Sequence, residues 1–275
     1  MAISAADVMK LRKATGAGMM DCKNALADAN GDFDAAVQII REKGKLVANK
    51  RSDREASEGA ALAGVSENGK FGAIVVLNCE TDFVAKNEDF VKKTKSFLDA
   101  AIANKPADLD ALKALELDGR SIESHVTEQT GVIGEKIEIS FYGKIEAESV
   151  VPYIHPGNKL ATLVGFNKGG IDTQVMRDVA MQVAAMNPVA VDKSDVSQEV
   201  IDKELEIAKE KFRQEGKPEA MLDKIAQGSL NKFFKENTLL NQAFVKDNKQ
   251  TVKDYLKSVD GDLTVTEFIR YTLAE

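Results

Sequence analysis

The sequence predicts an α+β protein in three parts: an N-terminal three-helix module of the ubiquitin-associated type, a core made of two copies of one ββα…αβ unit, and a helical hairpin inserted in the second copy. Only helical patterns occur in the N-terminal segment, two similar strand pairs follow, and a charged segment with helical spacing interrupts the second copy. The expected boundaries are 1–50 for the helical module, 51–58 for a linker, 59–145 for core subdomain 1, 146–193 and 242–275 for the two parts of core subdomain 2, and 194–241 for the helical hairpin.

The helical module is marked by its capping signals. Ser4 and Asp7 form an S-x-x-D capping box that opens a first helix through Leu11. The glycine-containing run 15–18 breaks this helix, and a second helix at 19–29 stops before an Asn-Gly pair, which is a C-cap signal. We therefore expect two short helices joined by tight turns.

A third helix is expected to follow Asp32, whose side chain can cap it. Its apolar face starts at Phe33 and continues at Val37 with helical spacing. Gly44 and the polar run 48–59 predict that the helix ends and that a linker leads to the core.

The first core unit opens with a strand pair. Two apolar runs at 60–65 and 71–77 flank an Asn-Gly turn at 66–69, which is a strong hairpin signal. The rest of the unit is expected to be a helix at 88–103 closed by Pro106, a second helix at 121–129, and a half-buried strand at 137–141.

The second core unit repeats this plan. A hairpin is expected to pair 150–154 with 160–166 around the turn 155–158, and its amino-acid sequence resembles that of the first hairpin. The long helices of the two units also end in similar runs, at 103–106 and 185–188. We infer an internal duplication, with later elements at 172–185 (helix), 252–258 (helix) and 263–268 (strand).

The insertion at 194–241 predicts an αα-hairpin. Apolar residues with helical spacing begin at Ile201 and, after a turn at Gly216, again at Met221, and charged residues surround both stripes. The hairpin either packs only on itself or also presents an apolar edge to a second molecule, for example in a homodimer.

Composition narrows the function classes. The formal net charge is -7, which argues against a nucleic-acid surface because phosphate binding needs an excess of Lys and Arg. A short basic stretch at 41–51 is interpreted as a solvated helix end, with nucleic-acid binding as the less favoured alternative. No export signal or membrane-spanning run is seen, so we expect a cytoplasmic protein. Cys22 and Cys79 are too sparse for a disulfide framework, and we expect both to be buried.

Signatures of catalysis are missing from the sequence. It has no glycine-rich phosphate loop and no G-x-S-x-G nucleophile motif. Its two histidines, His125 and His155, have no partners at metal-ligand spacing. We therefore expect no catalytic site, no cofactor and no metal site, and a function in binding another protein. A passive adaptor or chaperone, and an enzyme using a cleft between the core units, are the alternatives.

Two features would expose large side chains to solvent if the protein bound no partner. Met19 and Met20 open a helix in a small bundle, where they form either a contact surface or one buried and one partly exposed side chain. Tyr153, His155 and Pro156 lie at the turn of the second hairpin, where they form either a contact patch or simply a well-made turn.

A third such feature is the run Thr81, Asp82, Phe83 and Val84, between a strand and a helix. From the residues alone, Asp82 is best interpreted as a helix cap and Phe83 as a hydrophobic staple, with partner binding as the alternative.

Two long motifs resemble those of a known family. The run LRKATGAGMMDCKNAL at 11–26 and the run NCETDFVA at 78–85 are similar to the two signatures of bacterial elongation factor Ts. The resemblance covers essentially the whole chain. It implies a guanine-nucleotide exchange factor that binds elongation factor Tu in its GDP form and promotes GDP release.

The resemblance also implies roles for individual residues, and it replaces the staple interpretation of Phe83. Asp82 and Phe83 would intrude near the nucleotide's magnesium ion and displace the region that holds it. Ile133, within VIGE at 132–135, would insert beside the same region. The partner-binding residues implied are Thr81, Asp82, Phe83 and Val84 for magnesium dislocation, and Arg12, Met19, Met20, Ile133 and His155 for other contacts.

Two further implications concern the helical insertion and the end of the chain. In some members of the family the insertion serves dimer formation. Some relatives also continue past the last core strand with a helix that touches the GTPase, whereas this sequence stops at Glu275. We expect that contact to be absent and the helical module to contribute more of the binding to the partner.

Overall fold

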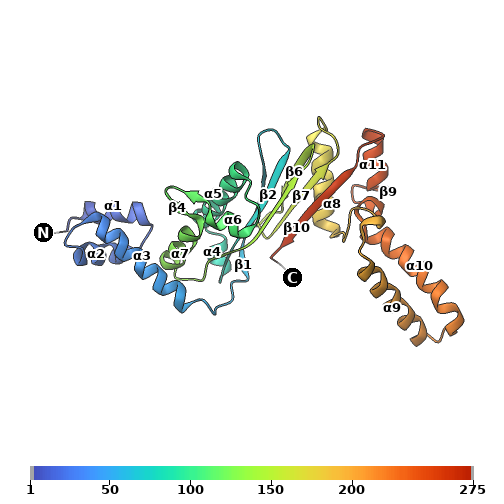
Figure 1. Cartoon of the computed structure of the whole chain (residues 1–275), viewed down its shortest axis with the longest axis horizontal. Coiled ribbons are helices and arrows are strands. Elements are labelled where there is room, and N and C mark those ends of the chain that lie inside the picture. Colours follow the sequence, from blue (N-terminus) through green and yellow to red (C-terminus); the bar gives the residue numbers. More distant parts are fainter. Residues whose placement is uncertain (1–2, 274–275) are drawn as a thin grey trace.

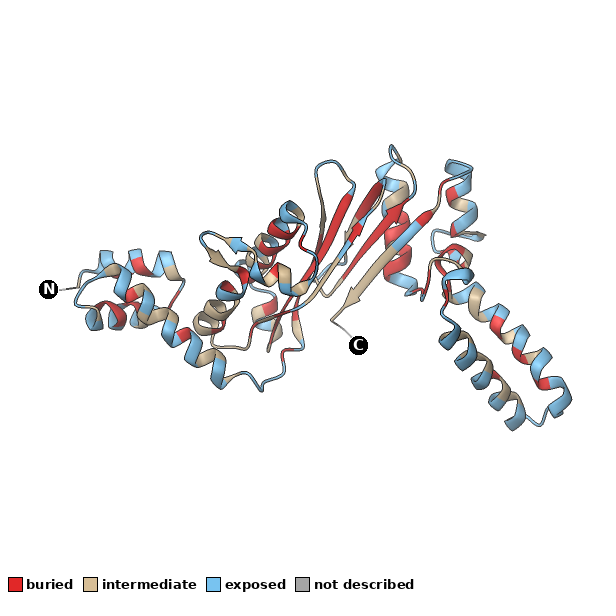
Figure 2. Cartoon of the chain, in the orientation of Figure 1, coloured by how far each residue is buried: buried red, intermediate tan, exposed pale blue. Residues whose placement is uncertain are grey.

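The computed structural model describes residues 3–273, so the expected features at 1–2 and 274–275 lie outside the described residues. The N-terminal helices lie at one end, two sheets with their helices form the middle, and a helical hairpin projects at the other end (Figure 1). The predicted α+β class is confirmed, and the buried residues concentrate in the sheets and in the helices that cover them (Figure 2).

The N-terminal module has the three predicted helices. The capping box at Ser4 is confirmed, because its Oγ accepts the Asp7 N–H at 3.1 Å while the Asp7 carboxylate accepts the Ser4 N–H. Asp32 caps the third helix, as predicted, through the Ala35 N–H. The helices are α1 (Ala5–Thr15), α2 (Met19–Asp28) and α3 (Phe33–Lys50).

The predicted end of the third helix at Gly44 is wrong, because α3 continues to Lys50. Gly44 is buried in the helix, where it faces Gly131 of α7 (Ile122–Ile133). Glycine is disfavoured inside a helix, but it lets two helix backbones approach closely. Packing against α7 therefore accompanies the continuation of α3 through a residue that local preference treats as a helix breaker.

The core holds two three-stranded antiparallel sheets with the same topology. In each, the second strand of a hairpin is central and the last strand of the unit pairs with it, in the orders β1-β2-β5 and β10-β7-β6. The predicted duplication of the unit is thereby confirmed in the topology. The strands are β1 (Glu58–Val65), β2 (Phe71–Cys79), β5 (Glu138–Glu146), β6 (Ser149–Ile154), β7 (Leu160–Phe166) and β10 (Val265–Thr272).

The helices of the two units correspond as well. A long helix follows each hairpin, and a shorter helix precedes each final strand. Each shorter helix is itself preceded by a small two-stranded hairpin that we did not predict. The helices are α5 (Glu88–Asn104), α7, α8 (Thr173–Met186) and α11 (Val252–Val259); the small hairpins are β3 (Glu116–Leu117) with β4 (Arg120–Ser121) and β8 (Ala243–Phe244) with β9 (Asp247–Thr251).

The remaining elements are short or belong to the insertion. The hairpin is built as predicted from two long helices whose facing apolar residues pack on each other, while Ile207 and Met221 stay about half exposed. The elements are α4 (Asp82–Ala85), α6 (Leu109–Ala114), η1 (Lys193–Asp195), α9 (Gln198–Gln214), α10 (Glu219–Asn237) and η2 (Leu239–Asn241).

The two sheets pack face to face and exchange equivalent hydrogen bonds. Ala61 of β1 donates its N–H to the Asn158 carbonyl at 2.7 Å, and Val150 of β6 donates its N–H to the Gly69 carbonyl at 2.7 Å. The two donors are equivalent positions of the duplicated unit, and so are the two acceptors. The layer between the sheets is apolar and buried, and it contains Ala61, Ala63, Ile74, Val76, Ile145, Val150, Ala161 and Leu163.

Gly72 is expected to tolerate no side chain in this layer. A Cβ added there would lie 2.7 Å from Val150 Cγ1 and 3.0 Å from Leu163 Cδ2. Overpacking of this kind costs about 1–3 kcal/mol, so Gly72→Ala should lower the free energy of unfolding by that amount in urea denaturation. Gly228→Ala is the matched control, because nothing lies within 4 Å of its added Cβ and alanine favours its helix. Equal stability of the two variants would contradict the tight packing of the sheets.

Candidate partner-binding site

The segment Thr81–Val84 forms the start of a one-turn helix directly after β2. Thr81 is the N-cap of α4, since its Oγ1 accepts the Val84 N–H at 3.4 Å. The interpretation of Asp82 as the cap is therefore wrong. Asp82 is the first helical residue, and its carboxylate instead accepts a hydrogen bond from Lys86 Nζ at 2.6 Å.

Phe83 points away from the protein. It is 85% exposed, more than any other large hydrophobic residue within 3–273. Its interpretation as a hydrophobic staple is therefore wrong. Instead, Val84 packs against the core of the first unit and Ala85 is buried in it. The short helix thus anchors itself through one pair of side chains and leaves an aromatic ring in solvent.

A carboxylate from the end of α7 holds the backbone before this ring. Glu135 Oε2 accepts the N–H groups of Glu80 and Thr81 at 3.1 and 3.0 Å, and Glu135 Oε1 accepts the Thr81 hydroxyl at 2.7 Å. Hydrogen bonds to an ionised carboxylate are stronger than those between neutral groups. Three of them fix the entry to α4 and, with it, the direction of Phe83.

Glu80 makes the reciprocal contact. Its carboxylate accepts the Lys136 N–H and also two hydrogen bonds from Arg51 Nη1 at 2.8 and 3.0 Å. The Lys136 N–H and then Arg51 hold the pKa of Glu80 below its usual range, so the side chain is an anion at neutral pH. Because Arg51 directly follows α3, the same anion ties the helical module to the segment that carries Phe83.

The charges around the ring are fixed as well. The hydrogen bond from Lys86, followed by the charge of Lys159, lowers the pKa of Asp82, which is ionised at neutral pH. On the buried side, Cys79 donates its thiol to the Thr81 carbonyl at 3.2 Å. Burial, with the nearby Glu135 carboxylate, raises the pKa of Cys79 to about 12, so this thiol is neutral and structural.

Ile133 lies close to Val84. It is the last residue of α7, it is half-buried, and Gly134 ends the helix in the left-handed conformation. Ile133 and Val84 line one hollow together with Gly16, from the turn between α1 and α2. The structure therefore brings the helical module, α7 and α4 to one surface.

His155 reaches the same end of the core from the second unit. It lies exposed in the turn between β6 and β7, and its Nδ1 is 3.0 Å from the Tyr153 hydroxyl. This turn lies against the first unit. The Asn158 carbonyl accepts the Ala61 N–H of β1, and Lys159 Nζ forms an ion pair with the Glu58 carboxylate at 2.8 Å. Glu58 is opposite Cys79 in the sheet, two residues before Thr81.

The remaining predicted contacts lie on the helical module. Met19 and Met20 are 43% and 64% exposed, which excludes the interpretation with one of them buried. Arg12 is exposed on α1. The partner-binding roles of all nine residues stay predictions. Sequence reasoning missed Arg51, Glu80 and Glu135 as the groups that hold the site, although both glutamates lie in the quoted motifs.

Residues 3–273 contain neither a metal-binding cluster nor a membrane-spanning helix. No group of three or more His, Cys, Asp or Glu side chains in this range is arranged to hold a metal ion. No helix in the same range has both the length and the apolar character needed to cross a bilayer.

Comparison with known proteins assigns the family. The model of the family Elongation factor TS matches residues 80–275. Proteins named elongation factor Ts from Christiangramia forsetii and Porphyromonas gingivalis are 56% and 55% identical to this chain, covering 98% and 99% of both sequences. One from Cytophaga hutchinsonii is 50% identical over 99% of both. The matches to these relatives extend over the helical module, both core units and the hairpin, and with the family model they show that the chain belongs to the elongation factor Ts family.

Proposed function

We propose that this chain is a guanine-nucleotide exchange factor that binds elongation factor Tu with GDP and promotes GDP release by displacing the magnesium-binding region. The observation that carries the proposal is Phe83, an aromatic ring 85% exposed on a segment that Glu135 clamps. A ring held outward on a fixed base can act as a wedge in a second protein.

The energetics require more than the wedge. Nucleotide release is reciprocal: this chain weakens GDP binding only as far as GDP weakens the binding of this chain. A shift of about 10⁴-fold needs roughly 5.5 kcal/mol of differential binding. Burying one phenylalanine supplies about 1.5–3 kcal/mol. The rest is assigned to the wider surface, which includes Ile133, His155 and the two methionines.

Asp82 acts as a competitor in this scheme. It is an anion beside Phe83, so it can accept hydrogen bonds from groups that otherwise bind the water shell of the magnesium ion. A single carboxylate is too few ligands to take the metal itself. Its role is to stabilise the opened pocket of the partner.

Release of a fluorescent GDP from elongation factor Tu tests the proposal. Substoichiometric amounts of this chain should accelerate release, because an exchange factor turns over. A passive adaptor would bind without accelerating release, and that outcome would reject the proposed function. The buried layer between the two sheets is apolar, which supports protein binding over an enzyme that uses a polar cleft between the core units.

Three further parts of the proposal are independent of this experiment. Homodimer formation through the hairpin of α9 and α10, a cytoplasmic location and the absence of direct nucleic-acid binding stay predictions. Light scattering of the purified chain tests the first.

A further inference from the structure

Helices α3 and α7 cross with their backbones in contact. A Cβ added to Gly131 would lie 2.3 Å from the Cα of Gly44, a distance that real side chains do not reach. A Cβ added to Gly44 would lie 3.7 Å from the Cα of Gly131, which is an ordinary contact. The contact therefore depends on glycine at 131 far more strongly than at 44.

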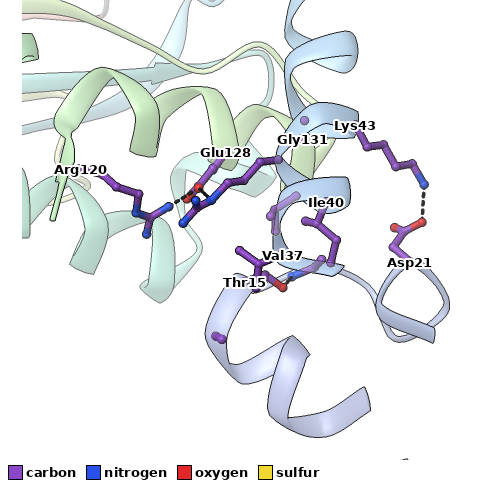
Figure 3. Close-up of a pocket in the computed structure, with 13 residues that line it drawn as sticks. Thr15, Asp21, Val37, Ile40, Lys43, Arg120, Glu128 and Gly131 are labelled. Atoms are coloured by element: carbon purple, nitrogen blue, oxygen red, sulfur yellow. Dashed lines mark hydrogen bonds and ion pairs between the residues drawn. The ribbon is translucent and has the colours of Figure 1, made fainter. Parts of the chain in front are cut away.

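Ion pairs flank this crossing. Arg41 of α3 donates its Nε hydrogen to Glu128 of α7 at 3.0 Å, and Arg120 from the small hairpin binds the same carboxylate (Figure 3). A small pocket of about 40 Å³ adjoins the crossing, and residues of α1, α3 and α7 line it. Val37 and Ile40 of α3 and Gly131 of α7 line this pocket together (Figure 3).

The crossing connects two parts of the proposed binding surface. The first half of α3 belongs to the apolar core of the helical module, which carries Met19 and Met20. Its second half is attached to the core subdomain at Arg41, Gly44 and, just beyond its end, Arg51. These three points span about 15 Å of a stiff helix, which is enough to fix its direction.

The other helix leads directly to the wedge. Gly131 lies two residues before Ile133, and Glu135, which holds Thr81, follows shortly after. The angle between α3 and α7 therefore sets where the methionines lie relative to Phe83. Two contacts held at a fixed distance bind a partner more tightly than the same contacts on a loose joint, because the ordering cost is met before binding.

We propose that Gly131 is a positioning residue that fixes the helical module relative to the segment 81–84, so that both meet elongation factor Tu together. This inference rests on the proposed function. Adding a methyl group at Gly131 forces the helices apart and loosens the module, whereas Phe83 stays held by Glu135. Affinity for the partner falls, and the maximal rate of GDP release does not.

Label distances and exchange kinetics test this role together. Spin labels are placed at two exposed sites, Lys23→Cys in the helical module and Lys92→Cys in the core. The distance between the labels reports how firmly the α3–α7 crossing holds the module, and no partner is needed. The native thiols Cys22 and Cys79 are buried. In the full-length chain, Gly131→Ala should broaden or shift the label distance. It should also raise the half-saturating concentration for GDP release about 10-fold or more, with a maximal rate within about twofold.

Three companion variants make the test decisive. Gly228→Ala carries the same chemical change at an open helical site and should match the unsubstituted protein. Gly44→Ala should have a smaller effect than Gly131→Ala, since its added Cβ finds ordinary contact distances. Arg41→Ala loosens the crossing without a clash, and it should broaden the label distance even if Gly131→Ala does not fold.

Specific outcomes would overturn the inference. The inference fails if folded Gly131→Ala keeps the label distance of the unsubstituted protein, or if Gly44→Ala has an equal or larger effect. It also fails if Gly131→Ala lowers the maximal rate of GDP release without changing the half-saturating concentration. If Gly131→Ala does not fold, an unchanged label distance in Arg41→Ala rejects the inference. Failure of the unsubstituted chain to release GDP would reject the proposed function instead, and the label distances would still report on the joint.

Discussion

Replacing Phe83 with alanine is expected to lower the stimulation of GDP release by about 10- to 100-fold, which is the loss of the roughly 1.5–3 kcal/mol that burial of the ring supplies. The free energy of unfolding should change by less than about 0.5 kcal/mol, because the ring contributes little to a fold in which it is 85% exposed. Stopped-flow release of fluorescent GDP at saturating concentrations of the variant measures the first quantity, and urea denaturation the second.

Complex formation should suffer less than release, because the wider surface keeps its contacts. Val259→Ala is the control: this valine is 45% exposed at the end of α11, in the second unit and away from α4, and its removal should alter neither quantity. Full stimulation by Phe83→Ala would refute the wedge role.

Replacing Glu135 with alanine is expected to have the second largest effect. It removes the acceptor for the N–H groups of Glu80 and Thr81 and for the Thr81 hydroxyl. Donors left without a partner cost about 1–3 kcal/mol in stability. Because Phe83 then loses its fixed base, stimulated GDP release should fall by about tenfold or more, as it would for a comparable loss of binding energy. Urea denaturation and the release assay measure the two effects.

Glu135→Gln separates the clamp from the charge. The amide oxygen can still accept the two N–H groups, and its NH₂ can donate to the Thr81 hydroxyl oxygen. Stimulated GDP release should therefore be fastest with Glu at position 135, slower with Gln and slowest with Ala. If glutamine and alanine weakened release equally while the fold remained intact, the negative charge and not the geometry of the clamp would be the cause.

The sequence predicted those elements that depend on local pattern. The Asn-Gly turn at 68–69, the alternation in 137–141 and the capping box at Ser4 each act over a few residues, and each predicted the element that the structure contains. The small hairpin around Asp118 and Gly119 was missed, although both have positive φ and an Asp-Gly pair is a recognised signal for such a turn.

The misassigned residues depend on contacts between distant segments. Gly44 was interpreted as a helix end because its partner, Gly131, belongs to another part of the chain. From the residue types of the segment 81–84 alone, Phe83 was interpreted as a hydrophobic staple, because phenylalanine is usually buried. Its exposure follows from the clamp by Glu135, and nothing in the pattern of either motif indicates that these segments pair. Only the family resemblance predicts a partner-binding role for the ring.

The mutual hydrogen bonds between the two sheets give the core the character of a dimer whose subunits are joined in one polypeptide. Each half supplies the surface that shields the other, with Ala61 and Val150 as matching donors. Neither half should therefore persist as a monomer when produced by itself. Cooperative melting of the whole core as one unit follows, and a fragment that ends before β6 should self-associate through the face that its missing twin would cover.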